Sequence, residues 1–144
     1  MIINNINLVK TAVTKQTASI DIQVRMARDE IMAAMIQLSQ EEIKGKRAEG
    51  EQATAGEPPK NRTGNLRRSI QGFKYTTGYA RYSAIVGPTM VYARAVELGG
   101  GYAPASWQGT SAMAGFPYMQ PAYEKLVQSG AINKIFIKHL GSLL

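Results

Sequence analysis

The sequence contains no cysteine, and this absence removes several classes of function at once. Disulfide frameworks, thiol nucleophiles and zinc sites built on cysteine are all excluded. Histidine occurs once, as His139, and no aspartate lies near it in the sequence to orient the ring. The sequence therefore offers few of the residues from which a Ser-His-Asp or Cys-His catalytic arrangement is built. We expect His139, near the end of the last helix, to be a surface residue.

Acidic residues are scarce in the second half of the chain. Aspartate occurs only at positions 21 and 29, and Glu97 and Glu124 are the only acids after position 57. A cage of carboxylates for two metal ions cannot readily be built from this set. The stretch "GEPPKNRTG" lacks the GxxxxGK[ST] order that cradles a nucleotide phosphate. We predict that the protein is not an enzyme and takes no metal and no cofactor.

Long apolar runs are also missing. No stretch approaches the roughly 18 apolar residues that a membrane span needs. The first residues, "MIINNINLVKTAV", lack a charged leader followed by an unbroken apolar run, so we expect no signal peptide. The expectation is a soluble protein, made and kept in a cytosol, with no membrane partner.

Basic charge, in contrast, is abundant and concentrated. The formal net charge is +7. The whole excess lies in residues 58–96, which contain no acid. Such a block indicates a polyanion or an acidic partner surface, although a solvated basic face is an equal alternative. Its cations are Lys60, Arg62, Arg67, Arg68, Lys74, Arg81 and Arg94.

The order of patterns predicts one domain over residues 1–144. Residues 17–47 are predicted to form a long amphipathic helix, because apolar residues recur there at spacings of three and four. The methionines of that stripe are interpreted as packing rather than as a cofactor pocket. Residues 45–62 and 99–115 are rich in small and polar residues and are predicted to be mobile loops.

Two short segments have the period-two pattern of strands. In residues 69–76, Ser69, Gln71, Phe73 and Tyr75 are predicted to share one face of a strand. Residues 79–87 also alternate, and Thr77-Gly78 between the two segments predicts a hairpin turn. Residues 89–101 fit either a short helix or a third strand, and residues 121–140 look helical, with an interruption at Ser129-Gly130. The predicted fold class is therefore α+β, with a long N-terminal amphipathic helix and a C-terminal helix packed on one face of a small antiparallel β-sheet.

Three segments carry a resemblance to a known family. They are "TGNLRRSI" (63–70), "VGPTMVYARAVELGG" (86–100) and "GFPYMQPAYEKL" (115–126). In this order, they resemble the tail-component or tail-completion (head–tail neck) family of tailed bacteriophages, typified by the gene-product-ten-like proteins of lambdoid siphophages. The resemblance spans about residues 17 to 126. The motif residues are Thr63, Gly64, Asn65, Leu66, Ser69, Ile70, Tyr92, Ala93, Gly99, Pro117, Tyr118, Pro121 and Ala122.

The motif residues also suit local structural roles. Gly64 would allow a turn with positive φ, and Thr63 or Asn65 could hydrogen-bond nearby backbone. Leu66 and Ile70 would anchor the start of the strand in the core. We further expect Tyr92 and Ala93 to pack against the sheet, and Pro117 and Pro121 to fix how the chain enters the last helix.

The resemblance implies a virion structural protein that works through assembly. Members form a ring, typically hexameric, at the head-proximal end of the tail, where they end tail-tube growth and help to join tail to head. The implied partners are further copies of the chain, the tail-tube protein and head-closure or connector proteins. Genomic DNA would pass through the lumen without sequence-specific binding. The predicted loops could become ordered only against neighbours.

Two sets of residues are candidates for these contacts. The subunit-joint candidates are Arg67, Arg68, Glu97 and Trp107. On an extended chain, Arg67 and Arg68 would face opposite sides. One could then pair with Glu97, within one subunit or between two, and the other could face the lumen or solvent. The lumen-facing or DNA-facing candidates are Lys60, Arg62, Lys74 and Arg81.

One alternative function stays open from the sequence. A small basic protein that binds nucleic acid without sequence specificity would also explain the cations of residues 58–96. Tyr75, Tyr79 and Tyr82 are interleaved with Lys74 and Arg81, and aromatic rings beside cations can stack on bases.

Overall fold

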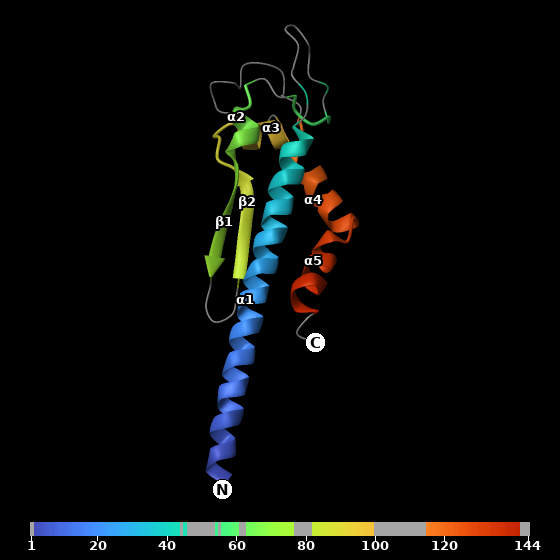
Figure 1. Ribbon diagram of the computed structural model, residues 1–144. Helices are drawn as coiled ribbons and strands as arrows, with labels where there is room; N and C mark the ends of the chain where they lie inside the picture. Colours follow the sequence, from blue (N-terminus) through green and yellow to red (C-terminus); the bar gives the residue numbers. More distant parts are fainter. Residues whose placement is uncertain are drawn as a thin grey trace.

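The computed structural model describes residues 2–43, 45, 54, 56–60, 63–76, 82–99 and 115–141. The elements follow the order of two helices, a hairpin and further helices (Figure 1). They are α1 (Ile2–Glu42), α2 (Asn65–Ser69), β1 (Ile70–Thr76), β2 (Tyr82–Pro88), α3 (Ala93–Leu98), α4 (Met119–Gln128) and α5 (Ala131–Leu140).

The predicted α+β class is confirmed. The long N-terminal helix and the C-terminal helices pack with a two-stranded antiparallel sheet. α1 is the centre of this arrangement, because it contacts both strands as well as α4 and α5. Figure 1 shows the sheet on one side of α1 and the C-terminal helices on the other. The two predicted loops, 45–62 and 99–115, lie largely outside the described residues.

The first helix is longer at its N-terminus than predicted. It begins at Ile2 rather than near residue 17, because residues 2–16 contain neither proline nor glycine and continue the three-and-four apolar spacing. It ends at Glu42, shortly before Gly45, which adopts a positive φ of 74°. At 41 residues, α1 is about 61 Å long, at 1.5 Å per residue.

Only part of α1 is covered by the rest of the chain. Its first half extends away from the body of the protein (Figure 1), and every side chain from Leu8 to Ala18 is exposed. We call residues 2–19 the arm. Ala27, farther along the helix, is fully buried. α1 therefore combines a packed half with an arm whose described apolar side chains face solvent.

The hairpin presents two different faces. β1 and β2 pair with Ile70 opposite Pro88 and Thr76 opposite Tyr82. On the face toward α1, Gly72 lies against Met32. The opposite face, which we call the outer face, carries Phe73, Tyr75 and Ile85, which are 46%, 47% and 58% exposed. The predicted shared face of Phe73 and Tyr75 is thus correct. Ser69, predicted to join it, ends α2 instead, and the Thr77-Gly78 turn lies outside the described residues.

A compact apolar core lies where α1 ends and the motif segments meet. Ile43, Ile70 and Tyr118 are buried together, as predicted for Ile70. The half-buried side chains packed around them are Ile36, Leu66, Val86, Val96 and Met119. Leu66 and Ile70 therefore do anchor the start of the strand.

The core contains one hydroxyl group without a partner. The ring of Tyr118 is fully buried, and no described residue offers its Oη a hydrogen bond. Burial raises the pKa of Tyr118, and the neighbouring Glu97 and Tyr92 raise it further. The hydroxyl is therefore neutral and unsatisfied.

Tyr118→Phe is expected to leave the protein as stable as the wild type or to stabilise it by up to about 1 kcal/mol. The change removes a buried polar atom that makes no bond and keeps the ring that fills the core. Urea denaturation of both proteins measures the difference. A loss of more than about 1 kcal/mol would show that the hydroxyl has a partner in solution.

The second half of the chain answers two questions that the sequence raised. Residues 89–101 contain the helix α3 rather than a third strand, and it ends at Gly99, which has a φ of 79°. The predicted interruption of the last helix is also confirmed. Gly130, with a φ of 65°, separates α4 from α5. α4 begins at Met119 and places Pro121 in its first turn, where the missing N–H costs nothing.

Candidate functional site

The three segments that carry the family resemblance meet at one end of the fold. Ile70 and Tyr118, from two of these segments, share the core, and Val96 from the third packs against them. The backbone also joins two segments directly, because Phe116 N–H donates to the Val96 carbonyl over 2.7 Å. We call this region the motif joint.

Glu97 is the polar centre of the motif joint. Its Oε2 accepts the backbone N–H groups of Tyr118, at 2.8 Å, and Met119, at 3.1 Å. Its Oε1 accepts the N–H of Gln120 at 3.1 Å. These are the N–H groups that a helix start leaves without partners, and Tyr118 provides no side-chain cap. The carboxylate also opposes the positive end of the α4 dipole. Glu97 therefore fastens α4 to α3.

The predicted pairing of Glu97 with Arg67 or Arg68 is not found within the described part of the chain. Both arginines lie on the short helix α2 rather than on an extended segment, so they do not face opposite sides. Arg68 Nη2 donates to the Thr63 carbonyl over 3.1 Å and to Asn65 Oδ1 over 2.8 Å. The expectation of an extended segment was wrong because a positive-φ residue, Gly64 at 78°, starts a helical turn that precedes the strand. A pairing with Glu97 of another subunit stays a prediction.

The other motif residues occupy local positions around the same joint. Thr63 Oγ1 lies 3.5 Å from the Asn65 N–H, and Ser69 Oγ donates to the Leu66 carbonyl over 2.7 Å. Tyr92 precedes α3 and lines a small pocket that Lys60, Gly64 and Leu66 also line. The remaining positions are buried or half-buried and pack locally: Ala93, Gly99, Pro117, Pro121 and Ala122.

The basic residues of 58–96 divide into two groups. Lys60, Arg67, Arg68 and Arg94 lie at the end of the fold that holds α2 and α3 (Figure 1), and we call this group the basic end. Lys74 lies on β1 instead, where its Nζ is 2.6 Å from Asp29 Oδ2. Arg62, Arg81 and the joint candidate Trp107 lie outside the described residues.

Asp29, the partner of Lys74, also pairs with a cation of its own helix. Arg28 also contacts Asp29, at 2.8 Å. Burial would raise the pKa of Asp29, but the hydrogen bonds from Lys74 and Arg28 outweigh it and hold that pKa below its ordinary value. Lys74 is thus engaged in holding the sheet to α1, which weakens it as a lumen-facing candidate.

The tyrosines proposed to stack on bases have different surroundings. The ring of Tyr82 faces α1, with the guanidinium of Arg25 4.8 Å and that of Arg28 5.7 Å from its centre. Tyr75 lies on the outer face, and Tyr79 is outside the described residues. A stacking platform built from all three rings is therefore not found in the described part of the chain.

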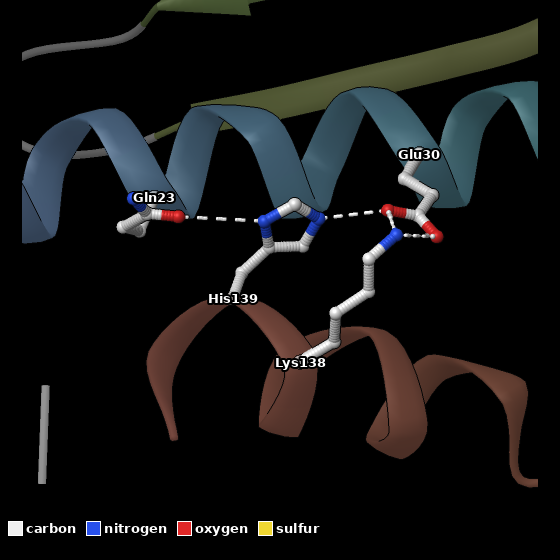
Figure 2. A network of polar contacts seen from close by, with 4 residues as sticks. All are labelled: Gln23, Glu30, Lys138 and His139. Carbon is white, nitrogen blue, oxygen red and sulfur yellow. Dashed lines mark hydrogen bonds and ion pairs between the residues drawn. The ribbon is translucent and has the colours of Figure 1, made fainter. Parts of the chain in front are cut away.

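His139 is buried, which corrects the prediction of a surface residue. It is 8% exposed and lies between α5 and α1 (Figure 2). Its Nε2 is 2.7 Å from Glu30 Oε2, and its Nδ1 is 3.4 Å from Gln23 Oε1. Lys138 Nζ contacts both oxygens of Glu30, at 2.9 and 2.8 Å. The lone histidine therefore works in a polar network that fastens the last helix to the first.

The network changes the acidity of Glu30. Hydrogen bonds from Lys138 and His139 lower its pKa below the ordinary 4.5, although desolvation opposes the shift. A carboxyl whose pKa is lower in the folded chain stabilises the fold above its unfolded pKa, and this stabilisation is lost as pH falls through the folded value.

Glu30→Gln is therefore expected to make stability less sensitive to acid. Between about pH 6 and about pH 3, the melting temperature of the wild type should fall by more than that of the variant. Thermal denaturation across this range measures both slopes. Lys134→Gln, on the exposed side of α5, changes one charge without touching the network and should keep the wild-type slope. Equal slopes for wild type and Glu30→Gln would contradict the role of the network.

Metal and membrane chemistry gain no support from the described residues. No group of three or more His, Cys, Asp or Glu side chains among them is placed to hold a metal ion. None of the helices that the structure describes combines the length and apolar character that crossing a membrane requires.

Comparison of the chain with protein-family models, with curated proteins and with solved structures found no match.

Proposed function

We propose that the protein is a virion structural protein that forms a ring at the head-proximal end of a phage tail, where it completes the tail and joins it to the head. It acts by assembly with further copies of itself, with the tail-tube protein and with head-closure or connector proteins. The resemblance of three ordered segments supports this proposal, and these segments are the ones that meet at the motif joint.

The observation that carries the proposal is the apolar outer face of the hairpin. Phe73 pairs across the sheet with Ile85, Tyr75 lies beside them, and all three are about half exposed. A two-stranded sheet with one apolar face open to water is only marginally stable by itself. Exposed groups of large apolar side chains mark contact sites between proteins. A ring gives such a face a neighbour to pack against.

The basic end supports a place beside DNA. Lys60, Arg67 and Arg68 have exposed side chains at one end of the fold. Exposed cations attract the phosphate backbone without reading its sequence. In a ring, this end would face the lumen through which the genome passes.

The basic end also favours the alternative function, a small protein that binds nucleic acid without sequence specificity. The two functions differ in free solution. A nucleic-acid-binding protein should bind duplex DNA with an affinity that falls steeply as salt rises. A neck protein should bind free duplex weakly and associate with its own copies or with tail proteins. Titration of duplex DNA at two salt concentrations, beside native mass spectrometry, separates them.

A variant of the outer face tests the proposed function in the virion. Phe73→Ser combined with Ile85→Thr removes apolar surface that the single chain leaves exposed, so the fold should remain. In a phage that depends on this variant, we expect unjoined heads and tails in electron micrographs. Ser83→Thr, a small change on the same face, is the control. Normal yields of joined, infectious particles from the double variant would contradict the proposal.

A further inference from the structure

The arm of α1 carries an apolar stripe that is continuous with the packed half of the same helix. Ile6, Val9 and Val13 follow one another at spacings of three and four, and all three are at least half exposed. Ile20 continues the stripe at the same angular position into the body of the protein. One helix face is thus covered by other elements along part of its length and open to water along the rest.

The packed half of this stripe forms the floor of an apolar groove. The sheet forms one wall and the C-terminal helices form the other, on the two sides of α1. The groove has a volume of about 440 Å³, and Arg28 is the only charged side chain among its lining residues. Representative lining residues are Val24 and Ile31 from α1, Ala84 and Val86 from β2, and Ile132 and Phe136 from α5.

The arm has the pattern that such a groove accepts. An amphipathic helix enters an apolar groove by placing anchors from one face at spacings of three, four and seven residues. Ile6, Val9 and Val13 have this spacing. Val13 lies 18 residues before Ile31, which belongs to the floor of the groove. Because 18 residues make about five helical turns, the two side chains have the same orientation on α1.

The formal charges of the arm and of the packed half of α1 differ in sign. The arm contains Lys10 and Lys15 and no acid, a net charge of +2. Residues 21–42 carry five acids against two arginines, a net charge of −3. Most of these acids are already paired within the chain, as Asp29 is with Lys74 and Glu30 is with Lys138. The apolar stripe, and not charge, therefore carries the contact between copies.

A chain cannot place its arm in its own groove. α1 is one continuous helix, and Val13 and Ile31 are about 27 Å apart along its axis. We propose that the arm of one copy lies in the apolar groove of a second copy, with Ile6, Val9 and Val13 against the groove wall. This contact does not depend on the proposed place in a virion.

The absence of cysteine makes the contact directly testable by cross-linking. Chains with Val13→Cys are mixed with differently tagged chains that carry Ile132→Cys in the groove, and the mixture is oxidised. We expect a disulfide-linked product that contains both tags. Lys15→Cys, two residues along on the opposite side of the arm, is the matched control and should give little product with Ile132→Cys. No product from Val13→Cys, or equal products from both arm positions, would overturn the inference.

A second variant tests the same contact without a cross-link. Val13 is 57% exposed in the single chain, so Val13→Asp should leave the fold intact. It should weaken self-association at least about tenfold, because a charge would enter the apolar groove. A fluorescent apolar dye should bind the variant more strongly, since its groove is no longer filled. Equal self-association, or equal dye binding by the two proteins, would mean that the arm is not the occupant.

The cross-linked product and the neck of the virion are independent readouts of this inference and of the proposed function. An arm–groove product together with a neck that contains no copy of this chain would leave the contact standing and would contradict the proposed function. A ring in the virion together with no arm–groove product would contradict the contact and leave the ring standing.

Discussion

Replacement of Glu97 by alanine is expected to lower the free energy of unfolding by about 2–4 kcal/mol. The carboxylate accepts three backbone N–H groups at the start of α4, from Tyr118, Met119 and Gln120. Hydrogen bonds to a charged acceptor are worth about 1.5–3 kcal/mol each, although bonds that share one acceptor do not add fully. Alanine would leave partly buried N–H groups without partners and would remove the favourable charge at the helix start.

Urea denaturation with two further variants tests this role. Glu97→Gln keeps one oxygen acceptor but loses the charge. Its free energy of unfolding should therefore fall by less than that of Glu97→Ala. Glu124→Gln, an exposed position on α4 whose partner is Gln120, is the control and should change stability by less than about 0.5 kcal/mol. Similar stabilities for wild type and Glu97→Ala would show that the cap is not what holds α4 to α3.

Gly72→Ala is expected to destabilise the fold by about 1–3 kcal/mol through overpacking. A Cβ added at Gly72 would lie 2.6 Å from Met32 Cγ, closer still to Met32 Sδ and 3.3 Å from Ile36 Cδ1. The two approaches to Met32 are too short for non-bonded atoms, so β1 and α1 would have to move apart or Met32 would have to leave its place. Glycine at this position is what allows the sheet to lie close to the helix.

The same hairpin provides the control for Gly72. At Gly87, opposite Gln71, an added Cβ meets no atom within 4 Å. Gly87→Ala should therefore be neutral or stabilise the protein by up to about 1 kcal/mol, because the unfolded chain loses freedom. Met32→Ala combined with Gly72→Ala should be less destabilised than the sum of the single changes. Equal effects of alanine at both glycines would contradict the close approach.

Local patterns in the sequence were sufficient to predict much of the fold. The three-and-four spacing of α1, the alternation in β1 and β2, and Ser129-Gly130 each reflect a property of neighbouring residues. The start of α1 was placed too late, although residues 2–16 continue its apolar spacing and contain no proline or glycine. The spacing also could not show that this part of the stripe is exposed. A stripe without a partner in the same chain has the same spacing as one that is buried.

The parts that could not be predicted depend on residues far apart in the sequence. The role of Glu97 requires the start of α4 to lie beside α3, and the burial of His139 requires Glu30 and Gln23 on α1. Arg67 and Arg68 were expected on an extended segment because the helical turn after Gly64 has only five residues, too few to show a period. The open groove beside α1 likewise has no signal in any single segment.

Electron cryomicroscopy of the neck of the parent virion tests the proposed function most directly. The account predicts a ring of this chain between the tail tube and the head connector. In that ring, the outer face with Phe73 and Ile85 would be covered by a neighbour, and the basic end with Arg67 would be directed toward the lumen. Well-resolved neck density that contains no copy of this chain would contradict it, and the nucleic-acid-binding alternative would then take its place.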